Sequence, residues 1–234
     1  MEKLYYFILL AGSFAVPFIW SFEKKISFFR LWSALFPAIV MMMLVFVSWD
    51  IIFTARGVWY FNHDYVAGYY IMGLPVEEWL FFVVIPYCIV FSYEVIRYFM
   101  PDLKNPAIAL AVNIALALVF LILGIMNTGR LYTATVMLFT SMLLFLQPFL
   151  RTHKSWLSHF FFTYIIIIIP FLLVNGALTG AFTHSPVVGY NDAENLGIRL
   201  FTVPVEDAVY LMGMMLLVQM IYERIKLARK RVVQ

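Results

Sequence analysis

The chain is poor in charge for its length. Only 12% of its 234 residues are charged and 64% are hydrophobic, and its mean hydropathy is +0.92. A soluble domain carries about twice that share of charge, because its surface must face water. The composition therefore excludes a soluble domain and predicts a protein that lies in a lipid bilayer.

Side chains that hold metals or nucleotides are also scarce. Cys88 is the only cysteine, so no disulfide can form within the chain and no group of thiolates can hold a metal. The four histidines lack the spacing of metal ligands, and the chain has neither a glycine-rich phosphate loop nor a dinucleotide fingerprint. We therefore expect no metal and no cofactor.

Seven apolar runs are long enough to span a membrane, which takes about 20 residues each. The fold class that they predict is all-α and integral to the membrane, with seven transmembrane helices. Only Lys3 is basic before the first run, which ends in Trp20-Ser21-Phe22, so we expect a permanent helix rather than a cleavable signal peptide. The runs cover residues 4–21, 31–53, 75–96, 107–126, 131–150, 156–175 and 204–222.

The basic residues are divided unevenly between the two ends of these spans. Seven spans place the termini on opposite sides, and 12 of the 16 Lys and Arg residues fall on the side of the C-terminus. Since basic residues favour the cytoplasmic side, we expect a multi-pass protein of the cell membrane with its N-terminus outside and its C-terminus in the cytoplasm. We interpret the basic tail, from Arg224 to Arg231, as an anchor beside anionic membrane lipid and not as a nucleic-acid site.

One acidic motif occurs twice, as Pro75-Val76-Glu77-Glu78 and as Pro204-Val205-Glu206-Asp207, and each copy opens an apolar run. The match extends upstream without a gap. A glycine stands seven residues before each proline and an asparagine thirteen residues before it: Gly68 and Asn62 in the first copy, Gly197 and Asn191 in the second.

This match predicts an internal duplication. Two repeats of three spans would have the same orientation in the membrane, with the fourth span as a linker between them. The predicted domains are residues 1–98, the linker span at 99–130, and residues 131–234. Such symmetry would bring the two acidic motifs together at one depth.

Two interpretations of the acids stay open. A proline followed by an acid is ordinary chemistry for the start of a helix, because the ring pre-sets φ and the carboxylate faces the positive end of the dipole. Charge at membrane depth is costly, however, and is commonly functional. Neighbouring carboxyls in a low dielectric cannot both ionise easily, so one keeps its proton and the pair offers an acid and a base. Asp50 ends the second span, where we expect an ion pair with Arg56 or a proton shared with the acids.

Aromatic residues crowd the loops before the third and seventh spans. An aromatic belt at the lipid interface is one explanation. The other is stabilisation of a cation, which is worth about 0.5 to 2 kcal/mol per desolvated ring. The rings in and next to the first loop are Trp59, Tyr60, Phe61, Tyr65, Tyr69, Tyr70, Trp79, Phe81 and Phe82, and those of the second are Phe182, Tyr190, Phe201 and Tyr210.

These motifs resemble the integral-membrane lycopene cyclases of carotenoid synthesis. In that family, two homologous domains of about three spans occur as separate subunits or fused in one chain. The resemblance covers nearly all of the sequence and rests on the segments Trp49–Thr54, Trp59–Asn62, Gly73–Phe82, Asn175–Thr179 and Pro204–Asp207.

The resemblance implies a cofactor-independent lycopene β-cyclase, which closes the acyclic ends of lycopene into β-ionone rings without net redox change. It implies lycopene or a related carotenoid as substrate, and it leaves room for association with other carotenoid enzymes. The implied catalytic residues are Glu77, Glu78, Glu206 and Asp207, and the implied substrate-binding residues are Asp50, Trp59, Phe61, Asn62, Tyr65, Trp79, Phe82, Asn175, Tyr190, Asn191 and Tyr210.

Other functions of a seven-span protein stay open to different degrees. A SWEET-like transporter has the same layout of spans, but it needs polar groups at mid-membrane, where these runs are almost purely apolar. A retinal-binding protein needs a lysine within the seventh span, and Lys226 lies in the tail beyond it. A cyclase or hydratase acting on another carotenoid would carry nearly the same motifs.

Overall fold

The computed structural model describes residues 2–103, 105–149 and 153–232, without the side chains of 153–155 and 230–232. Two of the basic residues that support the predicted topology, Lys104 and Arg151, lie outside this described part. The side chains of Lys154, Lys230 and Arg231 lie outside it as well.

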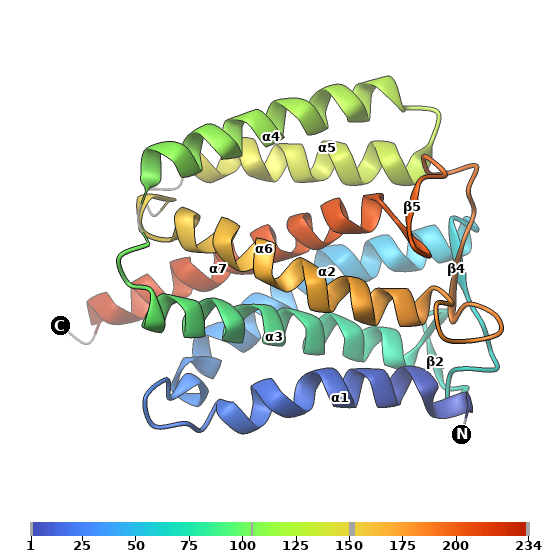
Figure 1. Cartoon of the computed structure of the whole chain (residues 1–234), viewed down its shortest axis with the longest axis horizontal. Helices are drawn as coiled ribbons and strands as arrows, with labels where there is room; N and C mark the ends of the chain where they lie inside the picture. Colours follow the sequence, from blue (N-terminus) through green and yellow to red (C-terminus); the bar gives the residue numbers. More distant parts are fainter. Residues whose placement is uncertain (1, 104, 150–152, 233–234) are drawn as a thin grey trace.

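Seven α-helices make up most of the described chain and lie side by side in one bundle (Figure 1). Each is long and apolar enough to cross a membrane, which confirms the predicted all-α, multi-pass membrane fold. Short 3-10 turns at Glu2–Leu4, Phe28–Leu31 and Gln147–Phe149 adjoin them. The helices are α1 (Tyr5–Trp20), α2 (Trp32–Ala55), α3 (Val76–Phe99), α4 (Pro106–Met126), α5 (Leu131–Leu146), α6 (His153–Leu178) and α7 (Glu206–Val232).

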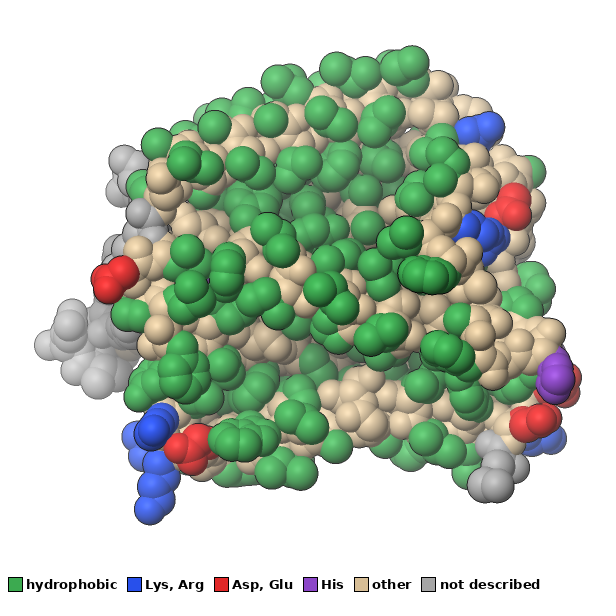
Figure 2. Space-filling view, viewed as in Figure 1, with side chains coloured by type: hydrophobic (Ala, Val, Ile, Leu, Met, Phe, Trp, Pro, Cys, Tyr) green, Lys and Arg blue, Asp and Glu red, His purple; other side chains and the backbone are tan. Residues whose placement is uncertain are grey.

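The outer surface of the bundle is apolar where a bilayer would contact it. Figure 2 shows hydrophobic side chains covering the visible flank, while charged side chains gather at the two ends. Leu44 on α2 and Ile165 on α6 are 69% and 64% exposed. Exposure of such large apolar side chains is unfavourable in water but not in lipid. The two chain termini lie at opposite ends of the bundle (Figure 1).

Short β-strands join the loops at the end of the bundle that holds the N-terminus, and the sequence did not predict them. Strands β2 and β3 pair with each other, as do β5 and β6. The remaining pair, β1 with β4, is antiparallel and joins the loop before α3 to the loop before α7. The strands are β1 (Trp59–Phe61), β2 (Tyr70–Ile71), β3 (Leu74–Pro75), β4 (Val188–Tyr190), β5 (Arg199–Leu200) and β6 (Val203–Pro204).

The hydrogen bonds next to the β1–β4 ladder are equivalent in the two halves of the chain. Asn62 N–H donates to the carbonyl of Val187 at 2.8 Å, and Asn191 N–H donates to the carbonyl of Val58 at 2.8 Å. Asn62 and Asn191 stand thirteen residues before their prolines, and Val58 and Val187 stand seventeen before them. Each half therefore makes the contact that its counterpart makes in return.

A glycine sits at the centre of this ladder for a steric reason. Gly189 faces Tyr60, and a Cβ added at Gly189 would lie 2.2 Å from Cζ of the Tyr60 ring. A side chain at this position would displace the exposed ring of Tyr60. The glycine therefore leaves room for this ring to lie across the ladder.

Ion pairs tie α3 to α7 at the opposite end. Arg97 Nη1 lies 2.7 Å from Oε1 of the buried Glu223, and Lys226 pairs with Glu94. The helices are thus joined at this end, and the loops that precede them are joined by the β1–β4 ladder at the other.

Candidate active site

Five carboxyl side chains are buried at the end of the bundle where α3 and α7 begin. Asp50 is 2% exposed, Glu77 and Glu206 are fully buried, and Glu78 and Asp207 are 7% and 2% exposed. As the sequence predicted, each acidic motif lies at the start of its helix: α3 begins directly after Pro75, and α7 begins at Glu206, two residues after Pro204. Burial of this many acids is costly unless they are hydrogen-bonded or functional.

The first acid of each motif holds a loop. Oε1 of Glu77 accepts a hydrogen bond of 2.8 Å from the N–H of Ala67, and Oε1 of Glu206 accepts one of 2.7 Å from the N–H of Leu196. In each case the donor stands ten residues before the acid. Thr133 also donates to Glu206, at 2.6 Å. These two glutamates thus fix the loops that precede their helices.

The second acid of each motif faces a cavity. Glu78 accepts a hydrogen bond of 2.6 Å from the hydroxyl of Tyr6. Asp207 accepts three hydrogen bonds, from the hydroxyl of Tyr132 at 2.5 Å, from that of Tyr190 at 2.9 Å and from Nδ2 of Asn175 at 2.6 Å. The structure therefore separates the motif into a loop-binding acid and a cavity-lining acid.

Tyr6 and Tyr132 hold equivalent places in the two halves. Besides their hydroxyl contacts, the N–H of Tyr6 donates to the carbonyl of Tyr65 and the N–H of Tyr132 to that of Glu194. Both carbonyls stand ten residues before the motif proline. The acidic motifs gave no sign of these two tyrosines, but each lies near the start of the first predicted span of its half, where the internal match could have been extended.

Asp50 also lines the cavity, near enough to Glu78 for their charges to interact. Its Oδ1 accepts a hydrogen bond of 2.5 Å from Nε1 of Trp59, and within the described part of the chain its Oδ2 has no partner. The ion pair expected with Arg56 is wrong, because Arg56 is exposed at the end of α2 and Trp59 takes its place. Asn175 holds the corresponding position in the other half.

The cavity itself is small, with a volume of about 50 Å³, and combines acids with aromatic rings. Trp59 and Tyr190 pack edge to face with ring centroids 6.1 Å apart, and Trp59 and Tyr132 do so at 5.3 Å. The lining residues are Tyr6, Asp50, Trp59, Phe61, Glu78, Phe81, Tyr132, Phe171, Asn175, Leu178, Val188, Tyr190, Asp207 and Tyr210.

Tyr190 lies in a loop outside the membrane-spanning helices and remains a proton donor. Burial, together with the neighbouring charge of Asp207, raises the pKa of its hydroxyl well above the ordinary value. The hydroxyl therefore keeps its proton and donates to Asp207 at neutral pH.

Five of the residues predicted to bind substrate lie beside the cavity rather than in its lining. Asn62 and Asn191 accept hydrogen bonds from the N–H groups of Asp64 and Ala193, so they cap turns. Tyr65 packs edge to face on Tyr5, Trp79 donates to the carbonyl of Ile71, and Phe82 packs against Phe46 in the core.

The arrangement of the buried acids suits proton transfer better than the binding of a metal ion. Among the described residues, no three His, Cys, Asp or Glu side chains are placed to hold one metal ion. Three carboxyls, those of Asp50, Glu78 and Asp207, instead line one small cavity together with rings that can face a positive charge. The fold and the site together define a multi-pass membrane protein with buried acids in an aromatic cavity.

Comparison with known proteins identifies the family. A model of the lycopene cyclase family matches residues 2–96 and 129–225, which together make up most of the chain. The chain therefore belongs to the lycopene cyclase family and is a carotenoid cyclase. No curated protein and no solved structure matches it. The two matched segments flank the predicted linker span.

Proposed function

We propose that this protein is a lycopene β-cyclase that works without a cofactor and uses Glu78, Asp50 and Asp207 for proton transfer. The observation that carries the proposal is that acids from both halves face one aromatic cavity. Ring closure needs a proton delivered to one carbon and another removed, so one site must hold an acid and a base together.

In the first step, a neutral carboxyl protonates the terminal double bond of an acyclic lycopene end and leaves a tertiary cation. The π electrons of a nearby double bond then form the new carbon–carbon bond, which closes a six-membered ring and moves the positive charge onto a ring carbon. Loss of a neighbouring ring proton to a carboxylate restores a double bond and yields the β end. One proton is taken and one is returned, so no oxidant or reductant is needed.

The hydrogen bonds support a division of roles. Asp207 has three donors, which suit a carboxylate that takes up a proton. Glu78 has one donor and lies beside Asp50. Two like charges so close in a low dielectric favour sharing one proton between them, so we assign the pair Glu78 and Asp50 as the acid and Asp207 as the base.

The remaining predicted residues support these groups. Glu77 and Glu206 position the loops that carry Tyr65, Glu194 and the strands, so we assign them as positioning residues rather than proton carriers. Trp59, Phe61 and Tyr210 line the space in which the cation would form and offer ring faces or edges to it. Lipid surrounds the bundle, and other carotenoid enzymes are proposed neighbours.

The test is expression in a bacterial host that accumulates lycopene, with chromatography and mass detection of the extracted pigments. Conversion to carotenoids with one or two β rings, at unchanged mass, is the expected result. Products heavier by one water per end would instead identify a hydratase, and products with other ring types would overturn the β assignment. Unchanged lycopene with the protein present in the membrane would contradict the proposal, and a transporter would then be considered.

The cofactor assignment has its own test. The protein is purified in detergent, freed of flavins and nicotinamides by extensive exchange, and mixed with lycopene. Ring formation at the rate of the unexchanged protein is expected. Activity that returns only when a flavin or nicotinamide is added would refute cofactor independence.

A further inference from the structure

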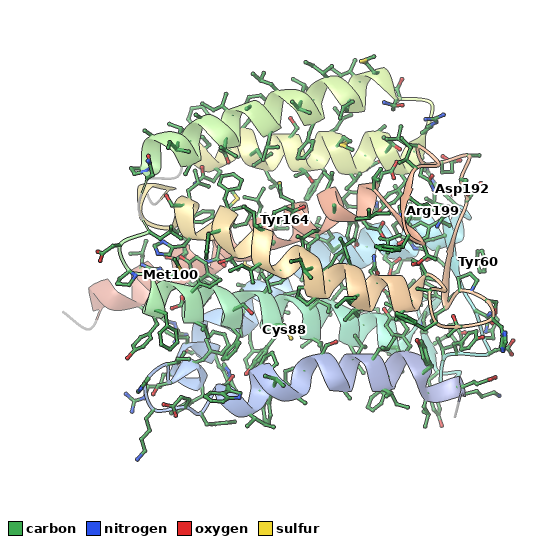
Figure 3. All side chains as sticks on the ribbon, viewed as in Figure 1. Tyr60, Cys88, Met100, Tyr164, Asp192 and Arg199 are labelled. Carbon is green, nitrogen blue, oxygen red and sulfur yellow. The ribbon has the colours of Figure 1, made fainter. Side chains whose placement is uncertain are left out.

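We propose that the apolar groove between α1, α3 and α6 binds the polyene chain of the carotenoid and guides its end into the acid-lined cavity. The inference rests on the proposed function and adds a binding site to it. The groove has a volume of about 490 Å³, and its lining is almost wholly apolar. Cys88, labelled in Figure 3, lies on α3 facing this space.

The groove and the cavity share a wall. Phe171 of α6 lines both of them, and no other residue of the described chain does so. It is 6% exposed and belongs to the wall that the two spaces have in common. A ligand in the groove is therefore one side chain away from the carboxyls.

The size of the cavity requires that this wall give way. A cavity of about 150 Å³ accepts a benzene molecule, whereas the cavity here has about 50 Å³. A carotenoid end that closes to a methylated six-membered ring needs more room than benzene. Rotation of Phe171 toward the groove would join the two spaces, which makes this face the route by which an apolar chain reaches the acids.

The corresponding seam of the other repeat is filled. Counting from Tyr6 and its equivalent Tyr132, the groove residues Gly12 and Ser13 correspond to Leu138 and Phe139. The ring of Phe139 packs edge to face on those of Phe46 and Trp49, at centroid distances of 5.6 and 5.4 Å.

The linker helix closes this second seam further. Leu138 lies against α4 so tightly that a Cβ on Gly124 would be 2.7 Å from its Cγ. The two halves share their acids and tyrosines but differ in the size of these side chains. If both seams were only lipid-facing surfaces, the two halves would not need side chains of different size there. A groove that binds a linear substrate in one half only does require this difference in size.

Substitution of Gly12 tests the proposal. A Cβ at Gly12 meets nothing within 4 Å, so Gly12→Leu fills the groove without forcing the backbone to move, and leucine favours the helix. We expect cyclisation to fall on the order of tenfold or more, because the substrate end is displaced. Ala11→Leu is the matched control: Ala11 is the exposed neighbour outside the groove, and this variant should retain its activity.

A second measurement detects binding without turnover. In the detergent-solubilised protein, the rate of alkylation of Cys88 by N-ethylmaleimide is followed by intact mass, with lycopene, with a phospholipid or with neither. Lycopene should slow the reaction at Cys88 but not at a cysteine placed outside the groove in the double variant C88A/A11C. Since Cys88 is the only cysteine, each signal has one origin.

The outcomes separate the two proposals. Protection of Cys88 by lycopene in a protein that makes no rings would refute the proposed function and leave the groove standing. Full cyclisation activity in Gly12→Leu would contradict the proposed role of the groove and leave the proposed function intact. Equal protection of Cys88 by phospholipid and by lycopene, or no protection by either, would also contradict the proposal that the groove binds a carotenoid.

Discussion

Trp59 and Tyr190 face each other across the β1–β4 ladder, and each donates its side-chain hydrogen bond to an acid of its own half. Trp59 donates to Asp50 at 2.5 Å and Tyr190 to Asp207 at 2.9 Å, with their ring centroids 6.1 Å apart. A short strand pair thus couples the two halves at the point where their acids meet.

Removal of the proposed acid or base should stop ring closure. Glu78→Gln and Asp207→Asn keep the shape of each side chain but cannot transfer the proton, so each should lower the rate by about 10²- to 10⁴-fold. Carotenoid turnover in membranes with matched protein levels measures the effect. Asp64→Asn, an exposed acid in the loop before α3, serves as the control and should remain active. Wild-type rates in both cavity variants would remove Glu78 and Asp207 from the mechanism.

The first acid of each motif should behave differently. Glu77→Gln retains an oxygen that can accept from the N–H of Ala67, whereas Glu77→Ala leaves that N–H unpaired at a cost of about 1 to 3 kcal/mol. We expect Glu77→Gln to keep most of its activity and Glu77→Ala to lose activity and thermal stability together. The same order should hold at Glu206.

The pH dependence of the rate separates positioning from proton transfer at these positions. Glu77→Gln should leave the shape of the pH–rate profile unchanged, because a positioning residue does not exchange the proton. A loss in Glu77→Gln as large as that in Glu78→Gln, or a displaced profile, would make Glu77 a catalytic residue instead.

Much of this fold could be predicted from the sequence, because the thickness of the bilayer fixes the length of a membrane-spanning helix. Seven spans, the acids at the starts of α3 and α7, and the shared level of the two motifs follow from hydrophobic run length and from the repeat. The roles within each motif could not be separated, since adjacent residues on a helix point about 100° apart and only the packing decides which one meets the cavity. Glu77 meets a loop and Glu78 the cavity.

The partners of the acids were harder to predict for a related reason. Tyr6 and Tyr132 come from helices that are distant in the sequence from the acids they contact. The β1–β4 ladder is only three residues long on each side, too short for a pattern of alternation to show. For Asp50 an ion pair with Arg56 or a shared proton was expected, and the sequence did not indicate that the indole of Trp59 donates to its Oδ1.

An exposed ion pair should give a small, pH-dependent gain in stability. Arg199 donates a hydrogen bond of 2.5 Å to Asp192, both labelled in Figure 3, and this bond holds the pKa of Asp192 below its ordinary value. A carboxyl with a lowered pKa stabilises the fold above the pKa of the unfolded chain, about 3.9, and loses that contribution as the pH falls through the folded pKa.

Asp192→Asn should therefore lower the unfolding free energy at pH 7 by at most about 1 kcal/mol, because the pair is solvent-exposed. The difference from wild type should vanish at acid pH below the folded value. Thermal unfolding in detergent at a series of pH values measures it, and Asp102→Asn at the other end of the bundle is the control. A difference that grows toward acid pH would show that Asp192 acts by another route.

The two donors of the ladder should differ in their effect on catalysis. Trp59→Phe leaves Asp50 with a contact of only 3.5 Å to Thr54, whereas Tyr190→Phe leaves Asp207 with hydrogen bonds from both Tyr132 and Asn175. Both replacements keep an aromatic ring in the cavity wall. We therefore expect a larger fall in rate for Trp59→Phe, on the order of 10- to 100-fold, since loss of a hydrogen bond to a charged or proton-sharing group costs about 1.5 to 3 kcal/mol. Turnover of lycopene at matched protein levels gives the ranking. Equal losses would indicate that ring packing between the strands matters more than either hydrogen bond, and a larger loss for Tyr190→Phe would place the more sensitive proton transfer at Asp207.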